Sequence, residues 1–475
     1  MTTKDKSQYI IFTLIIFITS AIILSMKTPF TGDEFYTLDI EKIHKPLLYK
    51  IIISGIIKIF NPISSDHVLI LRLSSLIFST ISILLWFIYY IKNKNQAFIF
   101  SILIITSGFL LRETIFFRYY SFYFMTSTIT FLVLLQAHNL FSVNQKLLIG
   151  FIGFILSPYL FFVLNGLQYF CYFLYILIFE KIRNARLRLS LIISNLIIFC
   201  CFLIYPKMIW WVFNWINIMD HAAINLSSTE LRGFTISTIV KPFYAIYQMI
   251  FGYDIIPTEL IIIAPLFILI SGIFLFLFYN IFQNNNKIFL FYLSIFIMPF
   301  LLIFYFFEAI TLPGFLQMDT RHGMLFYPLI ISSVLLSTDY LSNSMRKIFI
   351  NSLIFSQIIG VVNAHKEDKC DWSLISEKTN SYVEENKCRN ILLDGRSSQP
   401  FKFYNKNPKI NNLIQYTWGN EDSIKTWLHG RDNIILLLND YKSYTNLSLK
   451  QNWNSGESSY GRVSTLENLL TLLNK

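Results

Sequence analysis

The chain has 475 residues, of which 54% are hydrophobic, 17% aromatic and only 14% charged, and its mean hydropathy is +0.53. This composition excludes an ordinary soluble protein, because a soluble fold has no core large enough to bury so much apolar surface. The formal net charge of +11 does not indicate nucleic-acid binding, which requires a basic, aromatic-studded face on a soluble domain. We therefore expect a lipid bilayer as a partner and no nucleic acid.

Apolar stretches follow one another as far as residue 363. A transmembrane helix needs about 20 apolar residues, because the hydrocarbon layer is about 30 Å thick. The sequence predicts about eleven spans by this length criterion, near residues 8–25, 67–91, 96–111, 119–137, 147–163, 167–179, 190–206, 258–280, 288–307, 323–337 and 348–363. No small-residue cleavage site follows the first stretch, so we expect it to stay as an anchor.

Basic residues gather on one side of the predicted spans, as is typical of cytoplasmic loops. The loops on this side contain only three acids, Asp5, Glu180 and Asp339. Their twelve basic residues are Lys4, Lys6, Lys92, Lys94, Lys146, Lys181, Arg183, Arg186, Arg188, Lys287, Arg346 and Lys347. We expect a multi-pass protein of the cytoplasmic (inner) membrane with its N-terminus in the cytoplasm. An odd number of spans then puts the C-terminal segment outside.

The sequence becomes polar after residue 363. An amphipathic helix pattern covers 371–386, and short buried-strand patterns follow at 390–394 and 434–438. We predict two domains, a transmembrane catalytic domain at 1–363 and a small extracytoplasmic α/β domain at 364–475. Cys370 and Cys388 flank the predicted helix. The sequence leaves two alternatives open for them, a disulfide between the two residues or two free thiols.

The first outer loop contains the adjacent acids Asp33 and Glu34, just after the first span. Asp33 lies beside the aromatic Phe35 and Tyr36, so we expect its carboxylate to be partly desolvated. Partial burial makes a carboxylate a stronger general base. Chemistry at this place must use a lipid-borne substrate, because nucleotide sugars are absent outside the cytoplasm.

The stretch 46–60 is apolar but too short and too basic to cross a membrane. Lys50, Ser54 and Lys58 recur at every fourth residue and so share one stripe of a helix. This pattern is typical of a helix lying flat in the membrane interface, where it can form the floor of a site that opens to lipid.

Several short motifs stand near the predicted outer ends of the spans. They are Asp33-Glu34-x-Tyr36, His44-x-Pro46-Leu47-x-Tyr49, Arg72-Leu73-Ser74-Ser75-Leu76, Arg118-Tyr119-Tyr120, and Arg321-His322-Gly323 with Tyr327-Pro328. Together they resemble the GT-C membrane glycosyltransferases related to protein O-mannosyltransferases and lipid A aminoarabinose transferases. The resemblance covers residues 1–140 well and 320–330 in part, and it covers the middle of the chain by hydrophobicity alone.

The chain also departs from the family pattern. Glu34 and His44 are closer together than is usual, and Lys45 stands where the family tends to have proline. Phe116 and Phe117 replace the acid expected just before the Arg-Tyr-Tyr motif, which leaves Glu113 as the nearest substitute.

The resemblance implies an inverting transfer of a sugar from a polyprenyl phosphate to an acceptor hydroxyl on the outer side. Asp33 would deprotonate the acceptor, and Glu34 would orient it. The phosphate leaving group needs positive charge. The predicted substrate-binding residues are Tyr36, His44, Lys58, Arg112, Glu113, Arg118, Tyr120, Arg321 and His322. The reaction needs no cofactor; a divalent cation held with the help of His44 is a further alternative.

The acceptor is expected to be a glycan, a lipid or a protein, and we favour a surface polysaccharide or lipopolysaccharide. Three alternatives stay open. A polysaccharide flippase or other transporter would carry polar residues at mid-membrane and broken helices. An O-antigen polymerase would rely on basic outer loops. A membrane scaffold would have no catalytic residues, and outer cations such as Arg112 and Lys58 would then only snorkel to the surface.

Overall fold

The computed structural model describes most of the chain up to residue 180 and shorter stretches beyond it. The described residues are 1–27, 34, 47–60, 68–180, 189, 193–194, 249–251, 260–301, 324, 326–366, 376–377, 380, 384, 390–394, 401, 405, 407–411, 414–417 and 434–437. They belong to two compact units. The first unit comprises Met1–Ile22, Ile43–Gly55 and Arg72–Lys366, and the second comprises Ile23–Lys42, Ile56–Leu71 and Glu367–Lys475.

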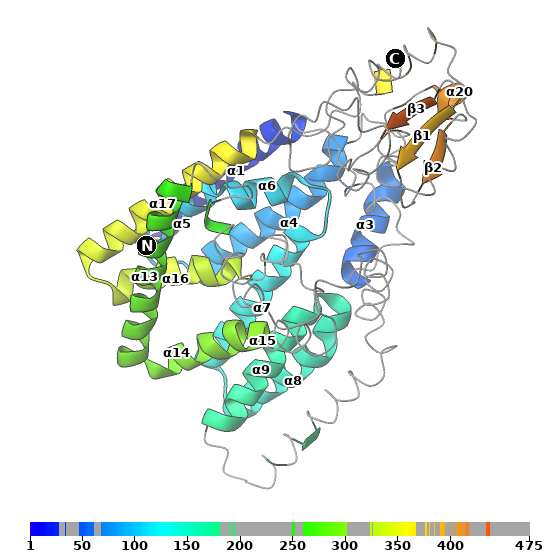
Figure 1. Cartoon of the computed structure of the whole chain (residues 1–475). Coiled ribbons are helices and arrows are strands. Elements are labelled where there is room, and N and C mark those ends of the chain that lie inside the picture. Colours follow the sequence, from blue (N-terminus) through cyan, green and yellow to red (C-terminus); the bar gives the residue numbers. More distant parts are fainter. Residues whose placement is uncertain are drawn as a thin grey trace, which may run out of the picture. The chain divides into compact units, whose positions relative to one another are not determined.

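Helices make up nearly all of the described chain as far as Lys366 (Figure 1). Apolar sequences favour helices in lipid because a helix satisfies every backbone hydrogen bond internally. Several helices have a polar N-cap residue. At the start of α5, for example, the Asn93 side chain accepts a hydrogen bond from the Gln96 amide at 2.8 Å. The bounds are α1 Thr3–Lys27, α3 Leu47–Phe60, α4 Val68–Tyr89, α5 Lys94–Thr106, α6 Gly108–Ile115, α7 Tyr120–Leu140, α8 Val143–Leu160, α9 Val163–Phe179, α13 Leu260–Asn284, α14 Asn286–Tyr292, the π-helix η5 Leu293–Ile297, α15 Met298–Leu301, α16 Tyr327–Tyr340 and α17 Asn343–Lys366.

Five of the described helices are long and apolar enough to cross a membrane, or six if the bent pair α5–α6 is one span. The five are Asp5–Met26, Leu69–Tyr89, Tyr120–Leu140, Ala264–Asn284 and Asn343–Val362. Shorter apolar helices, Val143–Ser157, Leu164–Phe179 and Asn286–Ile297, lie where further spans were predicted. Nearly all of the predicted span 190–206 lies outside the described residues. The helices therefore indicate a membrane protein, and the count of eleven spans stays a prediction.

The predicted span 96–111 is not one straight helix, because the chain bends by 58° between α5 and α6. Ser107 has an extended conformation, and its hydroxyl oxygen accepts a hydrogen bond from the Leu110 amide at 3.1 Å, which starts α6 anew. α6 packs closely against α17 at Gly108, where an added Cβ would lie 2.3 Å from the Gly360 carbonyl carbon. Only glycine permits this approach.

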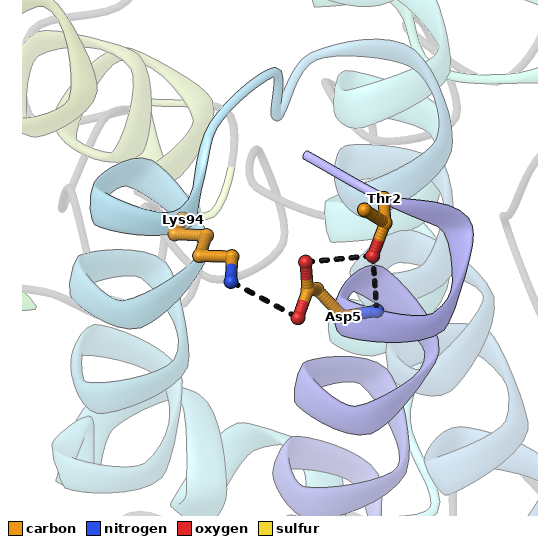
Figure 2. A network of polar contacts seen from close by, with 3 residues as sticks. All are labelled: Thr2, Asp5 and Lys94. Carbon is orange, nitrogen blue, oxygen red and sulfur yellow. Dashed lines mark hydrogen bonds and ion pairs between the residues drawn. The ribbon is translucent and has the colours of Figure 1, made fainter.

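Several helix ends that carry basic residues are joined by side-chain contacts. Figure 2 shows the first of these contacts, in which Lys94 of α5 pairs with Asp5 of α1 at 3.1 Å. The Thr2 hydroxyl donates to the same carboxylate at 2.6 Å and accepts from the Asp5 amide at 3.1 Å, which caps α1. The Lys6 ammonium also donates to the Ile88 carbonyl of α4 at 3.4 Å. The start of α1, the end of α4 and the start of α5 are thus held together.

A polar network lies inside the first unit where α14 passes into the π-helix η5. A π-helix has hydrogen bonds between residues five apart, so its bonding pattern does not continue that of an adjoining α-helix. The Gln168 side chain of α9 donates to the Ile295 carbonyl at 3.0 Å. Asn165 donates to the Gln168 side chain at 3.3 Å and accepts from the Thr126 hydroxyl at 3.2 Å. Asn165 and Gln168 are fully buried, so the network links α7, α9 and η5 within the apolar interior.

Three short strands are described beyond residue 389: β1 Asn390–Asp394, β2 Ile414–Thr417 and β3 Ile434–Leu437. They form a parallel sheet in the order β2-β1-β3, with Ile391 opposite Ile414 on one side and Ile435 on the other. The strand patterns predicted at 390–394 and 434–438 coincide with β1 and β3. Four residues of the predicted helix 371–386 are described, namely Ser376, Glu377, Asn380 and Glu384, and each is helical.

Candidate functional site

The predicted site residues fall into three groups. Asp33, Tyr36, His44, Arg321 and His322 lie outside the described residues, as do Cys370 and Cys388. In the second unit, Glu34 is helical and fully buried, and Lys58 is exposed in the last turn of α3. The first unit contains Arg112 and Glu113 of α6, Arg118 of the following turn and Tyr120 at the start of α7.

In the turn between α6 and α7, the Arg118 guanidinium lies over two neighbouring tyrosine rings. The Arg118 guanidinium carbon lies 5.5 Å from the centroid of the Tyr119 ring and 5.6 Å from that of Tyr120. Arg118 also donates a hydrogen bond of 3.4 Å to the Tyr120 hydroxyl. The two rings are 4.5 Å apart. Such cation–π contacts orient a guanidinium without neutralising its charge. Arg118, Tyr119 and Tyr120 therefore form one cationic and aromatic cluster.

α4 fixes the backbone of this turn. The Ser75 hydroxyl donates to the Phe116 carbonyl at 2.6 Å and lies 3.5 Å from the Arg118 carbonyl. One helical turn further along α4, the Ser79 and Thr114 hydroxyls are hydrogen-bonded at 2.8 Å. Buried carbonyls outside regular helix need such partners. The small polar residues of α4 therefore determine where Arg118 lies.

Tyr49 is a neighbour of Arg118 that the sequence did not single out as a site residue. Its ring is 1% exposed and packs 5.3 Å from Phe122 and 6.5 Å from Phe78. Its hydroxyl has no hydrogen-bond partner among the described residues. Burial raises the pKa of Tyr49, while the nearby Arg118 charge opposes the rise and Tyr120 adds to it. The only signal in the sequence was its position in the His-x-Pro-Leu-x-Tyr motif.

Charged residues of α6 and α4 are also buried. Arg112 and Glu113 of α6 are 8% and 2% exposed, and Arg72 in the first turns of α4 is 1% exposed. Ionisable residues inside an apolar protein are costly and commonly mark functional sites. Arg72 precedes Ser75 by one helical turn, so it belongs to the same end of α4 as the Arg118 turn. Arg72, Arg112 and Glu113 are therefore further candidates for a functional role in the first unit.

This end of α4 lies opposite to the basic helix ends described above. The other end of α4 contacts Lys6 through Ile88, and Gln136 of α7 donates to the Tyr89 carbonyl there at 3.4 Å. The Arg118 turn thus contacts the start of α4, whereas Lys6 of α1 contacts the end of α4.

The arrangement offers charge and hydrogen-bond donors for an anion. The Arg118 guanidinium, with the Tyr119–Tyr120 pair and Tyr49 near it, suits a phosphate bound next to apolar groups. Among the described residues, no group of three His, Cys, Asp or Glu side chains could hold a metal ion. The predicted general base and the late-span Arg-His pair belong to the part of the chain that is not described. Models of known families, curated proteins and solved structures give no match to this chain.

Proposed function

We propose that this protein is an integral membrane glycosyltransferase of the GT-C type. It transfers a sugar from a polyprenyl phosphate to an acceptor hydroxyl on the outer side of the inner membrane, in the modification of a surface polysaccharide or lipopolysaccharide. The observation that carries the proposal is the Arg118 turn, where a guanidinium stands over two tyrosine rings at one end of α4 and α7. A lipid phosphate needs such a cation close to apolar surface.

The proposed reaction is a single displacement with inversion. The acceptor oxygen attacks the anomeric carbon, and the bond from that carbon to the phosphate oxygen breaks, so its electron pair leaves with the polyprenyl phosphate. Asp33 takes the proton of the acceptor hydroxyl, and Glu34 orients the acceptor or a hydroxyl of the donor sugar. Arg118, with Arg112 and Arg321, stabilises the charge that develops on the leaving phosphate. No cofactor is needed for these steps.

The proposed architecture has eleven spans with the N-terminus in the cytoplasm and the polar tail outside as a small α/β domain. The five or six apolar helices and the parallel strands β1 to β3 support this architecture in part. The donor phosphate must stay at the membrane surface, so a tail above that surface would act on the acceptor. We propose that residues 364–475 shape acceptor choice.

The first test replaces Arg118 by alanine and measures turnover of a polyprenyl-phosphate sugar donor. Loss of a preorganised charge partner costs about 2–4 kcal/mol of transition-state stabilisation, so kcat/KM should fall by roughly 30- to 1000-fold. Lysine at this position should rescue activity only in part, since it lacks the planar fork. Arg346→Ala is the matched control, because Arg346 donates to Asn343 and Thr338 at the α16–α17 turn. Equal turnover by the Arg118→Ala and Arg346→Ala proteins would remove Arg118 from the site.

The second test addresses the general base. Asp33→Asn keeps the size of the side chain and removes its basicity, so surface glycan made in cells with this variant should lack the transferred sugar. Glycan mass spectrometry reads out the result, with immunoblotting for protein level. Normal glycan at normal protein level would argue against a glycosyltransferase.

A transporter for a lipid-linked glycan is a second candidate. The 58° bend between α5 and α6 and the π-helix η5 favour it, because broken helices with satisfied backbone groups are typical of transporters. A transporter would move a labelled lipid-linked sugar across a proteoliposome without any acceptor, and Asp33→Asn would leave this movement intact. The glycosyltransferase would show no such movement.

A further inference from the structure

A second cluster of charged and polar side chains lies in the first unit, away from the Arg118 turn. It is built at the end of α7, the start of α8, the end of α9 and the start of α14, which lie close together (Figure 1). Its residues are His138, Lys146, Tyr172, Tyr175, Glu180 and Lys287. The proposed glycosyl transfer uses none of them.

Aromatic rings hold the imidazole at the centre of this cluster. His138 stacks on Phe291, with ring centroids 4.8 Å apart, and lies 5.7 Å from the Tyr175 ring. Lys146, Glu180 and Lys287 are all within electrostatic reach of the imidazole. The ring is thus fixed in one orientation among three charged residues from three different helices.

The charges of the cluster do not cancel. Lys146 is 8% exposed and pairs with Glu180 at 2.8 Å, which neutralises one cation. Lys287 is exposed in the first turn of α14, and it has no ion pair within the described residues. The cluster therefore carries one net positive charge and favours an anion.

Two polar atoms of the cluster lack hydrogen-bond partners among the described residues, the His138 Nδ1 atom and the Tyr172 hydroxyl. Tyr172 is fully buried, its ring lies 6.0 Å from Phe291, and it is within electrostatic reach of Glu180. Native proteins satisfy nearly all buried polar groups. Both atoms are enclosed by protein, so a ligand at this cluster would contact the exposed Lys287 and the partly exposed remainder of the His138 ring.

Exposed apolar side chains surround the cluster. Leu140 is 71% exposed, Phe179 56% and Phe282 43%. Large apolar residues next to exposed lysines are typical of the level where a helix leaves the bilayer. The ligand therefore meets hydrocarbon as well as water, which a lipid satisfies and a free ion does not.

We propose that Lys287, His138 and Lys146 bind the phosphate of an anionic phospholipid headgroup, with the acyl chains lying along the exposed apolar residues of α7, α9 and α13. Phosphate oxygens accept hydrogen bonds from the lysine ammonium groups and the imidazole. A phosphate diester supplies the negative charge, and basic sites between helix ends on the cytoplasmic side commonly bind such headgroups. The site holds a lipid that stays bound and is not consumed.

The test measures lipid binding to the full-length purified protein in nanodiscs, with fluorescent phosphatidylglycerol against fluorescent phosphatidylcholine. The wild-type protein should prefer phosphatidylglycerol. Lys287→Ala should weaken phosphatidylglycerol binding about fivefold, the factor that one basic residue contributes near an anionic surface. His138→Phe keeps the stacking on Phe291 and removes the imidazole nitrogens, so it should weaken binding as well. Lys347→Ala, at an exposed position of α17, is the control and should bind like the wild-type protein.

Soluble glycerol phosphate distinguishes the two sources of a phosphate group. A lipid site should not release phosphatidylglycerol to millimolar glycerol phosphate, whereas a site for free phosphate should. Displacement by glycerol phosphate, equal binding of the two lipids, or unchanged binding in the Lys287→Ala protein would each overturn the proposal. Unfolding temperatures of all variants, measured in the same detergent, separate loss of binding from loss of fold.

Discussion

Arg118 and Tyr120 illustrate what a residue-scale motif predicts. They are two positions apart, so their contact across the start of α7 is local and follows from the Arg-Tyr-Tyr motif. Tyr49 comes from another helix, and its packing against Phe78 and Phe122 brings it beside Arg118. No local pattern in the sequence contains that contact. A contact between chain neighbours can thus be expected from a motif, whereas a contact made by packing between helices cannot.

We expect Tyr49→Phe to separate binding from stability. Phenylalanine keeps the buried ring and removes a hydroxyl that has no partner among the described residues, so the unfolding temperature should stay equal or rise. If the hydroxyl donates to the donor phosphate, its loss should cost about 1.5–3 kcal/mol in kcat/KM. Tyr279→Phe, at an exposed position of α13, is the control for both measurements. Unchanged kcat/KM would show that Tyr49 only packs.

At the scale of elements, hydropathy predicts that a helix exists but not that it is continuous. Membrane helices tolerate serine and glycine, so hydropathy alone does not predict the break at Ser107 and Gly108 between α5 and α6. Next to the break, α6 packs on α17, where the Gly360 backbone lies against Gly108. The π-helix η5 was missed for a similar reason, since Gln168 of another helix satisfies one of its carbonyls.

Gly108→Ala should destabilise the protein by about 1–3 kcal/mol, the usual cost of inserting a methyl group into a packed site. The new Cβ would lie 2.3 Å from backbone atoms of Gly360, which cannot move like a side chain. Gly272→Ala in α13 is the matched control, because nothing lies within 4 Å of its added Cβ. In denaturant unfolding in detergent, the midpoint of Gly108→Ala should be lower than that of the wild-type protein. The midpoint of Gly272→Ala should be equal to the wild-type value or higher. An equal loss in both variants would contradict close packing of α6 on α17.

Replacing Gln168 by leucine should also destabilise the protein, because the Ile295 carbonyl and the Asn165 amide would each lose a partner. Leaving buried polar groups unsatisfied costs about 1–3 kcal/mol per group. The measurement is again unfolding in detergent, with Gln283→Leu at the exposed end of α13 as the control. Unfolding of Gln168→Leu at the wild-type midpoint would show that the network does not stabilise η5.

For the whole molecule, the basic residues of the sequence predict which helix ends share a side, and the contacts agree for α1, α4 and α5. The Lys94–Asp5 pair and the Lys6–Ile88 hydrogen bond join ends that the loop charges assign to the cytoplasm. The loop charges predict that this side is the cytoplasm.

Single cysteines placed in a variant without the five native cysteines should report the orientation. In intact cells, an impermeant thiol reagent should label only cysteines on the outer side. Cysteines at Asn93, Ala185 and Asn285 should be protected, and cysteines at Gly395, Asn420 and Lys475 should react. Permeabilised cells, in which all six should react, provide the control. Labelling of Ala185→Cys in intact cells would reverse the assignment.

The sequence by itself determined the class of this protein, the positions of most helices and the positions of strands β1 and β3. These depend on composition and on patterns of a few residues, such as the apolar run of α13 and the Asn-Ile-Leu-Leu-Asp run of β1. The tertiary structure alone decided the bend at Ser107, the satisfied carbonyl in η5, and the Tyr49 hydroxyl beside Arg118. Each of these involves contacts between atoms of different helices. Such contacts have no counterpart in a local sequence pattern, because they exist only once the helices are packed.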